Sequence, residues 1–526
     1  MVVATATPLA DGDGARHVQR MARAGGLSLA GAGVSAVTGV ALTALITNGF
    51  NRSTAGTIFA TTSLFLIATA VVQLGTDIGL VRWLPALMIR GERDQLRPVL
   101  RIALLPVLGA SVLAALLGFL FASPIADAVA SHADHTSRVA QIQVLCVFLP
   151  VAAVYNVLLA GTRGLRTMVP TVATEAFGRS IVQLLAVGVV LFAGLGVVAV
   201  VVAWSLPYAV GLAVTVVWFG ALLRARGAQP PPAAPSDLLD GAEPGGYAGA
   251  FWRYTTPRAI GTASQMALKR SDIILVAALR SPAEAALYAA ATRFVVLGQL
   301  GVQALQQALS PQLAALFAQG DHRNARVVYR ATTAWSMLLA WPTYIACAVL
   351  APNLLRVFGA HYSSVSPVVV MLSIAMLAAT ASGAVDAVLL MSGHSWMSLG
   401  NNLFALALNI GLNLVLIPKY GAVGAGISWT VAIVLRNLLP MVQIAWKYHI
   451  SPIGRETALV ALTSVLTVGA VPIVLRLVSA PTLWVLAALA VGSAVFVLVV
   501  WRLREDLQLD AFVGIIRQPR RRARPA

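Results

Sequence analysis

Three ionisable residues stand close together inside an apolar stretch of the chain. The segment 266–278, MALKRSDIILVAA, carries Lys269, Arg270 and Asp272 among apolar residues. A charge at membrane depth is costly, so such residues usually face the interior of a helix bundle or a water-filled cavity. Arginine offers a planar fork of donors that suits phosphate oxygens, and lysine supplies a compact positive charge. The segment therefore predicts an anion site inside a hydrophobic bundle.

Two further arginines extend this candidate site. Arg293 lies in the next apolar run, and Arg82 lies at the end of an earlier one, where we expect the inner mouth of the bundle. Alternatively, Arg293 could form an ion pair with Asp272. That pair would have only a structural role, joining two helices. Lys269 and Asp272 are three residues apart and could pair along one helix face.

The remaining buried charges divide into coupling candidates and a structural pair. Asp272 and Asp386 are candidates for coupling to H+ or Na+, because buried acids titrate near neutrality. Apart from such ions we expect no cofactor and no metal centre. Glu175 and Arg179 are four residues apart, so they can form an ion pair along one helix.

Composition places this site in a membrane protein. The 526 residues are 59% hydrophobic and only 11% charged, with a net charge of +18, and the mean hydropathy is +0.83. Aromatic-interleaved basic patches are absent, so we expect no nucleic acid partner. The two cysteines, Cys146 and Cys347, lie in apolar runs and suggest neither a disulfide framework nor a thiolate metal site.

Apolar runs long enough to span a bilayer recur along the whole chain. A spanning helix needs about 20 such residues, and on that rule there are about fourteen runs. Basic residues gather in alternate loops, which predicts cytoplasmic amino and carboxyl termini. The predicted organisation is a cytoplasmic segment 1–24, a first lobe 25–222, a cytoplasmic Pro/Gly-rich linker 223–250, a second lobe 251–447, two further helices 456–502 and a basic cytoplasmic tail 503–526.

The two halves of the chain resemble each other. At a constant offset, Phe59 aligns with Tyr288 and Gly91 aligns with Gly320. Six helices separate the copies, so they run in the same direction, and parallel repeats of this kind enclose a central cleft. The predicted fold is an all-α membrane protein with two parallel-related six-helix lobes around a central cavity, plus two C-terminal helices.

A block near residue 410 carries a recognisable motif. Residues 401–428 contain spaced asparagines and then an LIP-x-x-G-x-x-G-A turn, here Asn409, Asn413, 416–418, Gly421, Gly424 and Ala425. This block resembles polysaccharide-biosynthesis flippases of the multidrug/oligosaccharidyl-lipid/polysaccharide exporter superfamily, as do residues 269–294 and 355–377. The resemblance spans residues 25–500. Taken by themselves, Asn409 and Asn413 are structural polar residues that bond across helices.

The resemblance implies a function. It implies a flippase that moves an undecaprenyl-pyrophosphate-linked oligosaccharide from the inner to the outer leaflet of a bacterial cell membrane, for cell-surface polysaccharide synthesis. The pyrophosphate and sugar would bind Arg270, Arg293, Lys269 and Arg82. Besides the lipid-linked glycan and membrane lipids, the candidate partners are polysaccharide polymerases and glycosyltransferases.

Three alternatives belong to different classes. A multidrug–cation antiporter of the same superfamily would favour acidic residues in the cavity, and a peptidoglycan-precursor lipid flippase would share the basic one. A membrane enzyme would need a catalytic constellation, but no Ser-His-Asp, paired-carboxylate or metal-ligand spacing is present. We therefore predict that the protein is not an enzyme.

Overall fold

The fold is built from α-helices. The computed structural model describes residues 13–129, 135–165, 167–227, 246–392, 394–507 and 509, and these ranges contain no β-strand. Most of the predicted linker and tail lies outside the described residues. The helices of the first half are α1 (Asp13–Gly49), α2 (Arg52–Val72), α3 (Thr76–Ile89), η1 (Arg93–Gln95), α4 (Leu96–Leu120), α5 (Ala122–Val129), α6 (His135–Gly164), α7 (Val169–Thr171), η2 (Val172–Arg179), α8 (Ser180–Phe192) and α9 (Val197–Gly227). Those of the second half are α10 (Tyr247–Leu279), α11 (Pro282–Ala291), α12 (Arg293–Ala318), α13 (His322–Val349), α14 (Ala351–Leu355), η4 (Arg356–Phe358), η5 (Ala360–Val365), α15 (Ser366–Ala381), α16 (Val385–Met391), α17 (Ser395–Tyr448), α18 (Arg455–Ser464), η6 (Val465–Ala470), α19 (Val471–Leu477) and α20 (Thr482–Arg502).

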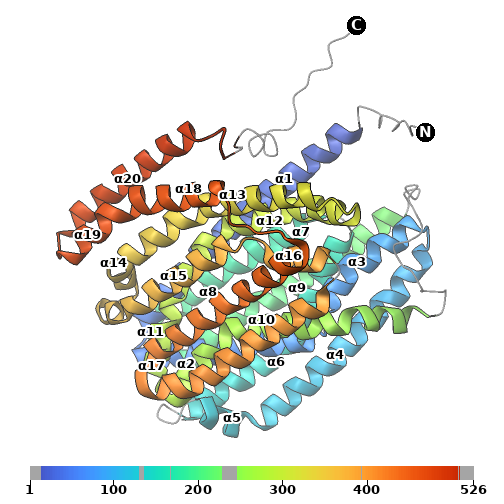
Figure 1. Cartoon of the computed structure of the whole chain (residues 1–526). Helices are drawn as coiled ribbons and strands as arrows, with labels where there is room; N and C mark the ends of the chain where they lie inside the picture. The colour runs from blue at the N-terminus through green and yellow to red at the C-terminus, as the bar shows by residue number, and fades with distance from the viewer. Residues whose placement is uncertain are drawn as a thin grey trace, which may run out of the picture.

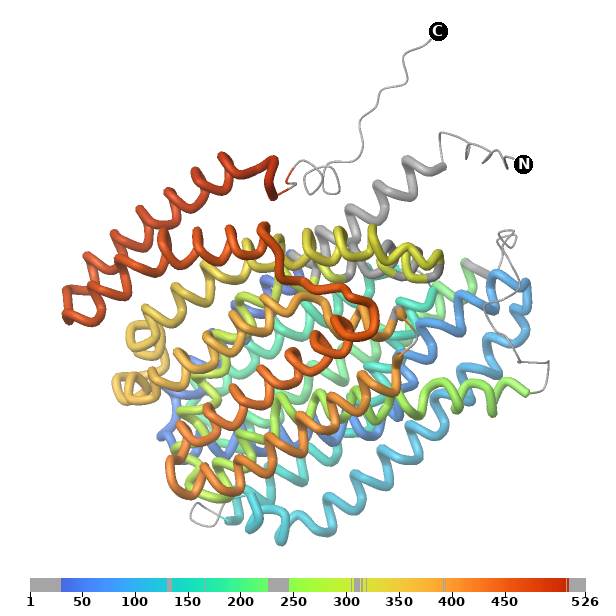
Figure 2. Tube along the Cα trace, in the orientation of Figure 1, coloured from blue at the N-terminus to red at the C-terminus, as the bar shows by residue number. Residues whose placement is uncertain are grey.

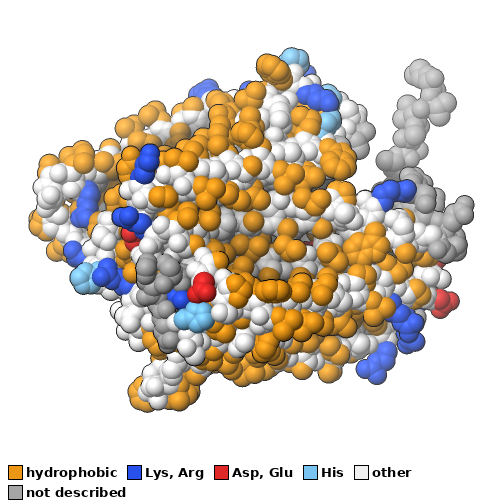
Figure 3. Space-filling model, turned by 90° about the horizontal axis from the view of Figure 1, so that it is seen from below, with side chains coloured by type: hydrophobic (Ala, Val, Ile, Leu, Met, Phe, Trp, Pro, Cys, Tyr) orange, Lys and Arg blue, Asp and Glu red, His pale blue; other side chains and the backbone are white. Residues whose placement is uncertain are grey.

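The helices form a bundle with an apolar outer surface. Most lie side by side with similar axis directions, and α19 and α20 lie at the periphery (Figure 1). The space-filling view shows a broad apolar band whose charged side chains concentrate toward its ends (Figure 3). Within the described residues, eleven helices are long and apolar enough to cross a membrane, or twelve if one bent pair forms a single span. The prediction of an all-α, multi-pass membrane protein is confirmed.

The predicted number of fourteen spans is not confirmed, and two helices account for much of the difference. Helix α10 has 33 residues, but Lys269, Arg270 and Asp272 make it less apolar than the spans. Helix α17 has 54 residues and counts once, although its backbone leaves helical geometry at Gly421. The count of fourteen stays a prediction.

Helix α17 is a helical hairpin. Gly421 has φ 57° and ψ −134°, a conformation that a side chain would disfavour. A Cβ on Gly424 would lie 2.3 Å from the carbonyl oxygen of Leu416, so the two arms meet closely at the turn. The orange trace in Figure 2 reverses direction here. The glycines of the sequence motif thus permit the turn.

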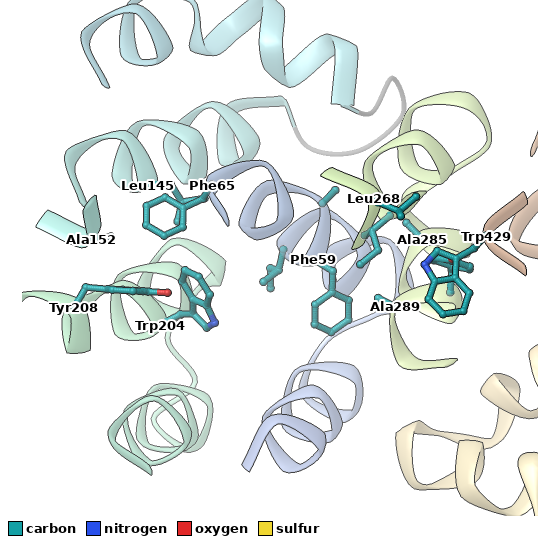
Figure 4. Packing of buried hydrophobic residues seen from close by; sticks show 14 of the residues in the cluster. Phe59, Phe65, Leu145, Ala152, Trp204, Tyr208, Leu268, Ala285, Ala289 and Trp429 are labelled. Carbon is teal, nitrogen blue, oxygen red and sulfur yellow. The ribbon is translucent and has the colours of Figure 1, made fainter. Parts of the chain in front are cut away.

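The two halves of the chain pack against each other through α2. This helix contacts α10 and α11, while α1 contacts α12 and α3 contacts α10. Figure 4 shows Phe59 of α2 close to Ala289 of α11, in a buried core that continues to Phe65, Trp204 and Tyr208. One continuous hydrophobic core therefore includes residues of both lobes.

The contact between α2 and α11, here termed the α2–α11 seam, depends on small residues. Ala55, Ala285 and Ala286 in it are fully buried. A Cβ on Gly56 would lie 1.6 Å from the carbonyl oxygen of Pro282, so only glycine allows this approach.

The repeat between the halves is visible in one local structure. Gly91 and Gly320 both have positive φ, 77° and 70°. The amide of Glu92 donates to the Leu87 carbonyl, and the amide of Asp321 donates to the Leu316 carbonyl. Helices α3 and α12 therefore end in the same way, as their aligned sequences suggest.

A glycine substitution tests the α2–α11 seam. Gly56→Ala should lower the free energy of unfolding by about 1–3 kcal/mol, because the added methyl overpacks a backbone contact. Gly109→Ala on α4, where an added Cβ meets nothing within 4 Å, is the matched control. It should be neutral or stabilising, since alanine favours helix by about 1 kcal/mol. Thermal unfolding in detergent measures the stability of both variants. Equal effects of the two substitutions would contradict the claim that the seam depends on close packing at Gly56.

Candidate functional site

A cavity of about 300 Å³ lies between the two halves of the bundle. Its wall is made by residues of α1, α2, η2, α8 and α9 from the first half and by α10 and α12 from the second. Arg179, Arg270 and Arg293 line it, and none of its described lining residues is Asp or Glu. The cavity therefore has a positively charged wall in an otherwise apolar bundle.

Arg179 is held by a network on its own side of the cavity. It ends the π-helical turn η2, and its Nε and Nη2 donate to Glu175 Oε1 at 2.9 and 2.6 Å. Its Nη1 donates to Gln183 Oε1 at 2.9 Å, and Gln183 in turn donates to the Trp204 carbonyl. The guanidinium carbon lies 5.2 Å from the centre of the Tyr208 ring. The Glu175–Arg179 ion pair expected from the sequence is present and fixes this guanidinium.

Arg270 and Arg293 line the cavity from the second half of the chain. Both side chains are partly buried, and neither makes an ion pair among the described residues. The Nε of Arg293 is buried without a hydrogen-bond partner there. A guanidinium has five N–H donors, so these two side chains retain donor capacity toward the cavity. Their geometry suits an anion that is not part of the protein.

Asp272 belongs to a separate network between α10, α11 and α17. It is 1% exposed. Tyr288 donates to its Oδ2 at 2.8 Å, and Asn413 donates to its Oδ1 at 2.7 Å. Asn413 also donates to Asn409 at 3.1 Å. The structure thus joins the charged segment of α10 to the asparagine motif of α17, and Asp272 has neither Lys269 nor Arg293 as an ion-pair partner.

Asp386 is neutralised in a third network. Arg436 donates to Asp386 at 3.0 Å and to Asn402 at 2.7 Å. Ser398 donates to the second oxygen of Asp386 at 3.4 Å. These contacts link α16 to both arms of the α17 hairpin, so the geometry gives Asp386 a packing role.

Two predicted ligands lie outside the wall of the cavity. Lys269 is exposed on α10, and Arg82 is exposed on α3. The Arg82 guanidinium carbon lies 4.3 Å from the centre of the Tyr254 ring. The structure therefore brings Arg270 and Arg293 together and places Arg82 elsewhere on the junction of the lobes.

Several cavity residues were not among the sequence candidates. Trp204 and Tyr208 are four residues apart on α9 and present their rings to the cavity, and Gln183 faces it from α8. The spacing of the two aromatics was a usable signal. Gln183 had no such signal, because an isolated amide in an apolar run is common helix-to-helix glue.

Metal chemistry finds no support in the described part of the chain. No group of three or more His, Cys, Asp or Glu residues there could hold a metal ion. Cys146 and Cys347 are both free thiols.

Comparison with known proteins identifies the fold. Residues 248–367 match a family described as "Polysaccharide biosynthesis protein", and no curated protein sequence matches the chain. The lipid II flippase MurJ in an inward closed conformation gives a TM-score of 0.65 at 11% identity, over 92% of this chain and 99% of that chain. An inward-facing MATE family multidrug resistance transporter of the MOP superfamily gives 0.61 at 13% identity, over 79% and 94%. The chain has the MOP superfamily fold.

The MOP fold accommodates binding pockets of different charge. A MOP superfamily transporter from Pyrococcus furiosus, described as having a binding pocket of reverse polarity, gives a TM-score of 0.55 at 14% identity, over 81% of this chain and 95% of that chain. The solved structures that share this fold are described as transporters and a flippase. The resemblance seen in the sequence is thereby confirmed, and the prediction that the protein is not an enzyme is consistent with these matches.

A tyrosine substitution tests the charge on Asp272. Tyr288→Phe should lower the free energy of unfolding by about 1.5–3 kcal/mol, because it removes a hydrogen bond to a buried carboxylate. Tyr329→Phe is the control, since that buried hydroxyl donates to the neutral Ser382 carbonyl at 2.6 Å. Its loss should be about 0.5–1.5 kcal/mol. Equal losses in thermal unfolding would mean that Asp272 is neutral.

Proposed function

We propose that this protein is a flippase for an undecaprenyl-pyrophosphate-linked oligosaccharide or a related lipid-linked glycan precursor. It would carry this cargo from the inner to the outer leaflet for cell-surface polysaccharide synthesis. The observation that carries the proposal is the cavity lined by three arginines and by no described carboxylate. The match of residues 248–367 to a polysaccharide biosynthesis family supports the cargo class.

The chemistry of the cavity suits a pyrophosphate. A pyrophosphate bears several negative charges and cannot enter hydrocarbon without replacing its hydration. Arg270 and Arg293 could supply charge-assisted, bidentate hydrogen bonds, which are among the strongest in proteins. Arg179 adds positive charge but already shares its donors with Glu175 and Gln183. The first two arginines are therefore the proposed clamp for the headgroup.

Transport of a glycan requires the lobes to move. A cavity of about 300 Å³ is at the lower end of the range of about 300–1,000 Å³ for ligand pockets. An oligosaccharide would fit only if the lobes separated on one side. Parallel-related lobes are suited to rocking about a central site, so we propose alternating access. The α2–α11 seam would open in one of the two states.

The cellular setting follows from this cargo. We propose a bacterial inner membrane location with cytoplasmic termini, as the loop charges indicate. Glycosyltransferases would supply the lipid-linked glycan, and a polysaccharide polymerase would consume it on the other side. The basic tail would contact anionic lipids of the inner leaflet.

Coupling to an ion is a further part of the proposal. Asp272 is buried and accepts hydrogen bonds from Tyr288 and Asn413, while Asn409 lies beside Asn413. This set of oxygens could take up H+ or Na+. Asp386 is the weaker candidate, because it forms an ion pair with Arg436.

Two alternatives are separated by the charge and size of the cargo. A multidrug–cation antiporter needs acidic cavity residues, and the described lining lacks them. A peptidoglycan-precursor flippase uses the same pyrophosphate chemistry, and the similarity to the MurJ fold keeps it as the second candidate. The cavity arginines favour the two kinds of flippase equally. Only the identity of the transported glycan can therefore distinguish the oligosaccharide flippase from the peptidoglycan-precursor flippase.

Arginine substitutions test the proposed function. In liposomes that contain a labelled undecaprenyl-pyrophosphate glycan, Arg270→Gln and Arg293→Gln should each slow flipping about tenfold or more, the effect of losing a charge-assisted hydrogen bond. Arg101→Gln, at an exposed position on α4, is the control and should flip at the wild-type rate. Wild-type rates in both cavity variants would contradict the proposal.

Ion coupling has a separate test. If flipping responds to an imposed Na+ or proton gradient, Asp272→Asn should abolish that response, because the neutral amide cannot exchange charge. Asp386→Asn should keep it, even if the protein becomes less stable. A gradient response that persists in Asp272→Asn would exclude this residue as the coupling site.

A further inference from the structure

Two arginines share one aromatic ring at the junction of the lobes. The guanidinium carbons of Arg82 and Arg258 lie 4.3 and 3.7 Å from the centre of the Tyr254 ring. They cannot be farther apart than the sum of these distances, about 8 Å. Each cation–π contact stabilises by about 0.5–1 kcal/mol at an exposed site. Two like charges so close to each other still repel.

Ion pairs within the described residues do not compensate these two charges. Neither arginine forms an ion pair among the described residues. Arg258 Nη1 donates to the Tyr254 carbonyl on its own helix at 2.9 Å, which leaves its other donors available. Glu92, on the chain just after α3, accepts from Tyr247, two helical turns before Tyr254. A bound anion is the natural counter-charge for two such guanidiniums.

The pair is held in place by rigid contacts between the two halves. Arg82 comes from α3 and Arg258 from α10. The neighbouring Trp83 is buried, and its ring packs edge-on against Tyr247 and Phe251 of α10 at 6.0 and 5.9 Å. This packing fixes the relative position of α3 and α10, the helices from which the two arginines project.

One face of α10 connects this pair to the middle of the bundle. Tyr254, Arg258, Thr262, Gln265 and Lys269 follow one another at three- and four-residue spacing, so they share a helix face. None of the five is fully buried, and Lys269 is exposed. At membrane depth a polar face of this kind usually faces the bundle interior or a water-filled cavity.

The same helix leads on to the arginine cavity. Lys269 lies eleven residues beyond Arg258, about 16 Å along the helix, and its neighbour Arg270 lines the cavity. A headgroup that leaves the arginine pair would follow α10 to Lys269 and then cross to the neighbouring Arg270, about 100° further around the helix, to reach the central site.

We propose that Arg82, Tyr254 and Arg258 form a second anion site, here termed the mouth site. It binds the phosphate or pyrophosphate of the cargo headgroup before the headgroup passes along α10 to Arg270. This inference rests on the proposed function for its cargo but not for its anion chemistry. The phosphate could belong to a lipid or be free in solution, and the experiment separates the two.

Equilibrium binding tests the mouth site without transport. The full chain carrying Arg270→Gln and Arg293→Gln is placed in phosphatidylcholine nanodiscs and titrated with radiolabelled farnesyl pyrophosphate. The mouth site should give saturable binding that weakens about tenfold or more when Arg82→Gln or Arg258→Gln is added. Arg253→Gln, at an exposed position on the same helix, should change nothing. The mouth site is overturned if this double variant binds no probe, or if its binding is unchanged by both Arg82→Gln and Arg258→Gln.

Two further experiments identify the ligand and control for misfolding. Displacement of the probe by inorganic pyrophosphate alone would show that the site takes the free anion, whereas displacement only by farnesyl pyrophosphate would show a lipid-linked one. Either result supports an anion site. In the otherwise unchanged chain, Arg258→Lys preserves the charge and should weaken probe binding less than Arg258→Gln does; equal weakening counts against recognition by charge.

The two proposals fail separately. Flipping at the wild-type rate in Arg270→Gln and Arg293→Gln would contradict the proposed function but would not affect the binding result. Slow flipping in those variants, together with probe binding that is unchanged by substitution of Arg82 or Arg258, would contradict the mouth site alone.

Discussion

Uncompensated positive charge inside an apolar bundle is the constraint on which this structure depends. Burying a charge costs several kcal/mol unless a partner or a wet cavity offsets it. Arg179 has Glu175 and Gln183, and Arg436 has Asp386 and Asn402. Arg270 and Arg293 have no described partner of opposite charge and face the cavity instead. The cavity therefore presents positive charge that the proposed anionic cargo would offset.

The packing of the lobes is consistent with a site that must open and close. The α2–α11 seam holds the halves together through a close backbone approach at Gly56, with Phe59 of α2 packed beside Ala289 of α11. Around the cavity, the Phe65 ring packs edge-on against Trp204 and Tyr208, whose own rings pack at a tilt, and these contacts join α2 to α9 in the first lobe. Parallel-related lobes of this kind suit rocking about a central site.

Sequence reasoning succeeded where one helix carries the whole signal. The Glu175–Arg179 pair depends only on a spacing of four residues, and the turn at Gly421 depends on a local motif. It did not find the partners of Asp272: the sequence left pairing with Lys269 or Arg293 open, and the carboxylate instead accepts from Tyr288 and Asn413. Partners on different helices depend on how each helix is rotated about its axis. In a membrane protein that rotation is poorly encoded, because lipid-facing and core-facing positions are both apolar.

The positive charge of the cavity can be measured directly. Val296 lines the cavity one turn after Arg293 and is 41% exposed. In a chain with Cys146 and Cys347 replaced by alanine, Val296→Cys should react faster with an anionic than with a cationic methanethiosulfonate reagent. Leu195→Cys, in the exposed turn after α8, is the reference. The account predicts a preference for the anionic reagent at Val296→Cys that Arg270→Gln and Arg293→Gln abolish. Equal rates for both reagents, or a preference for the cationic one, would contradict it.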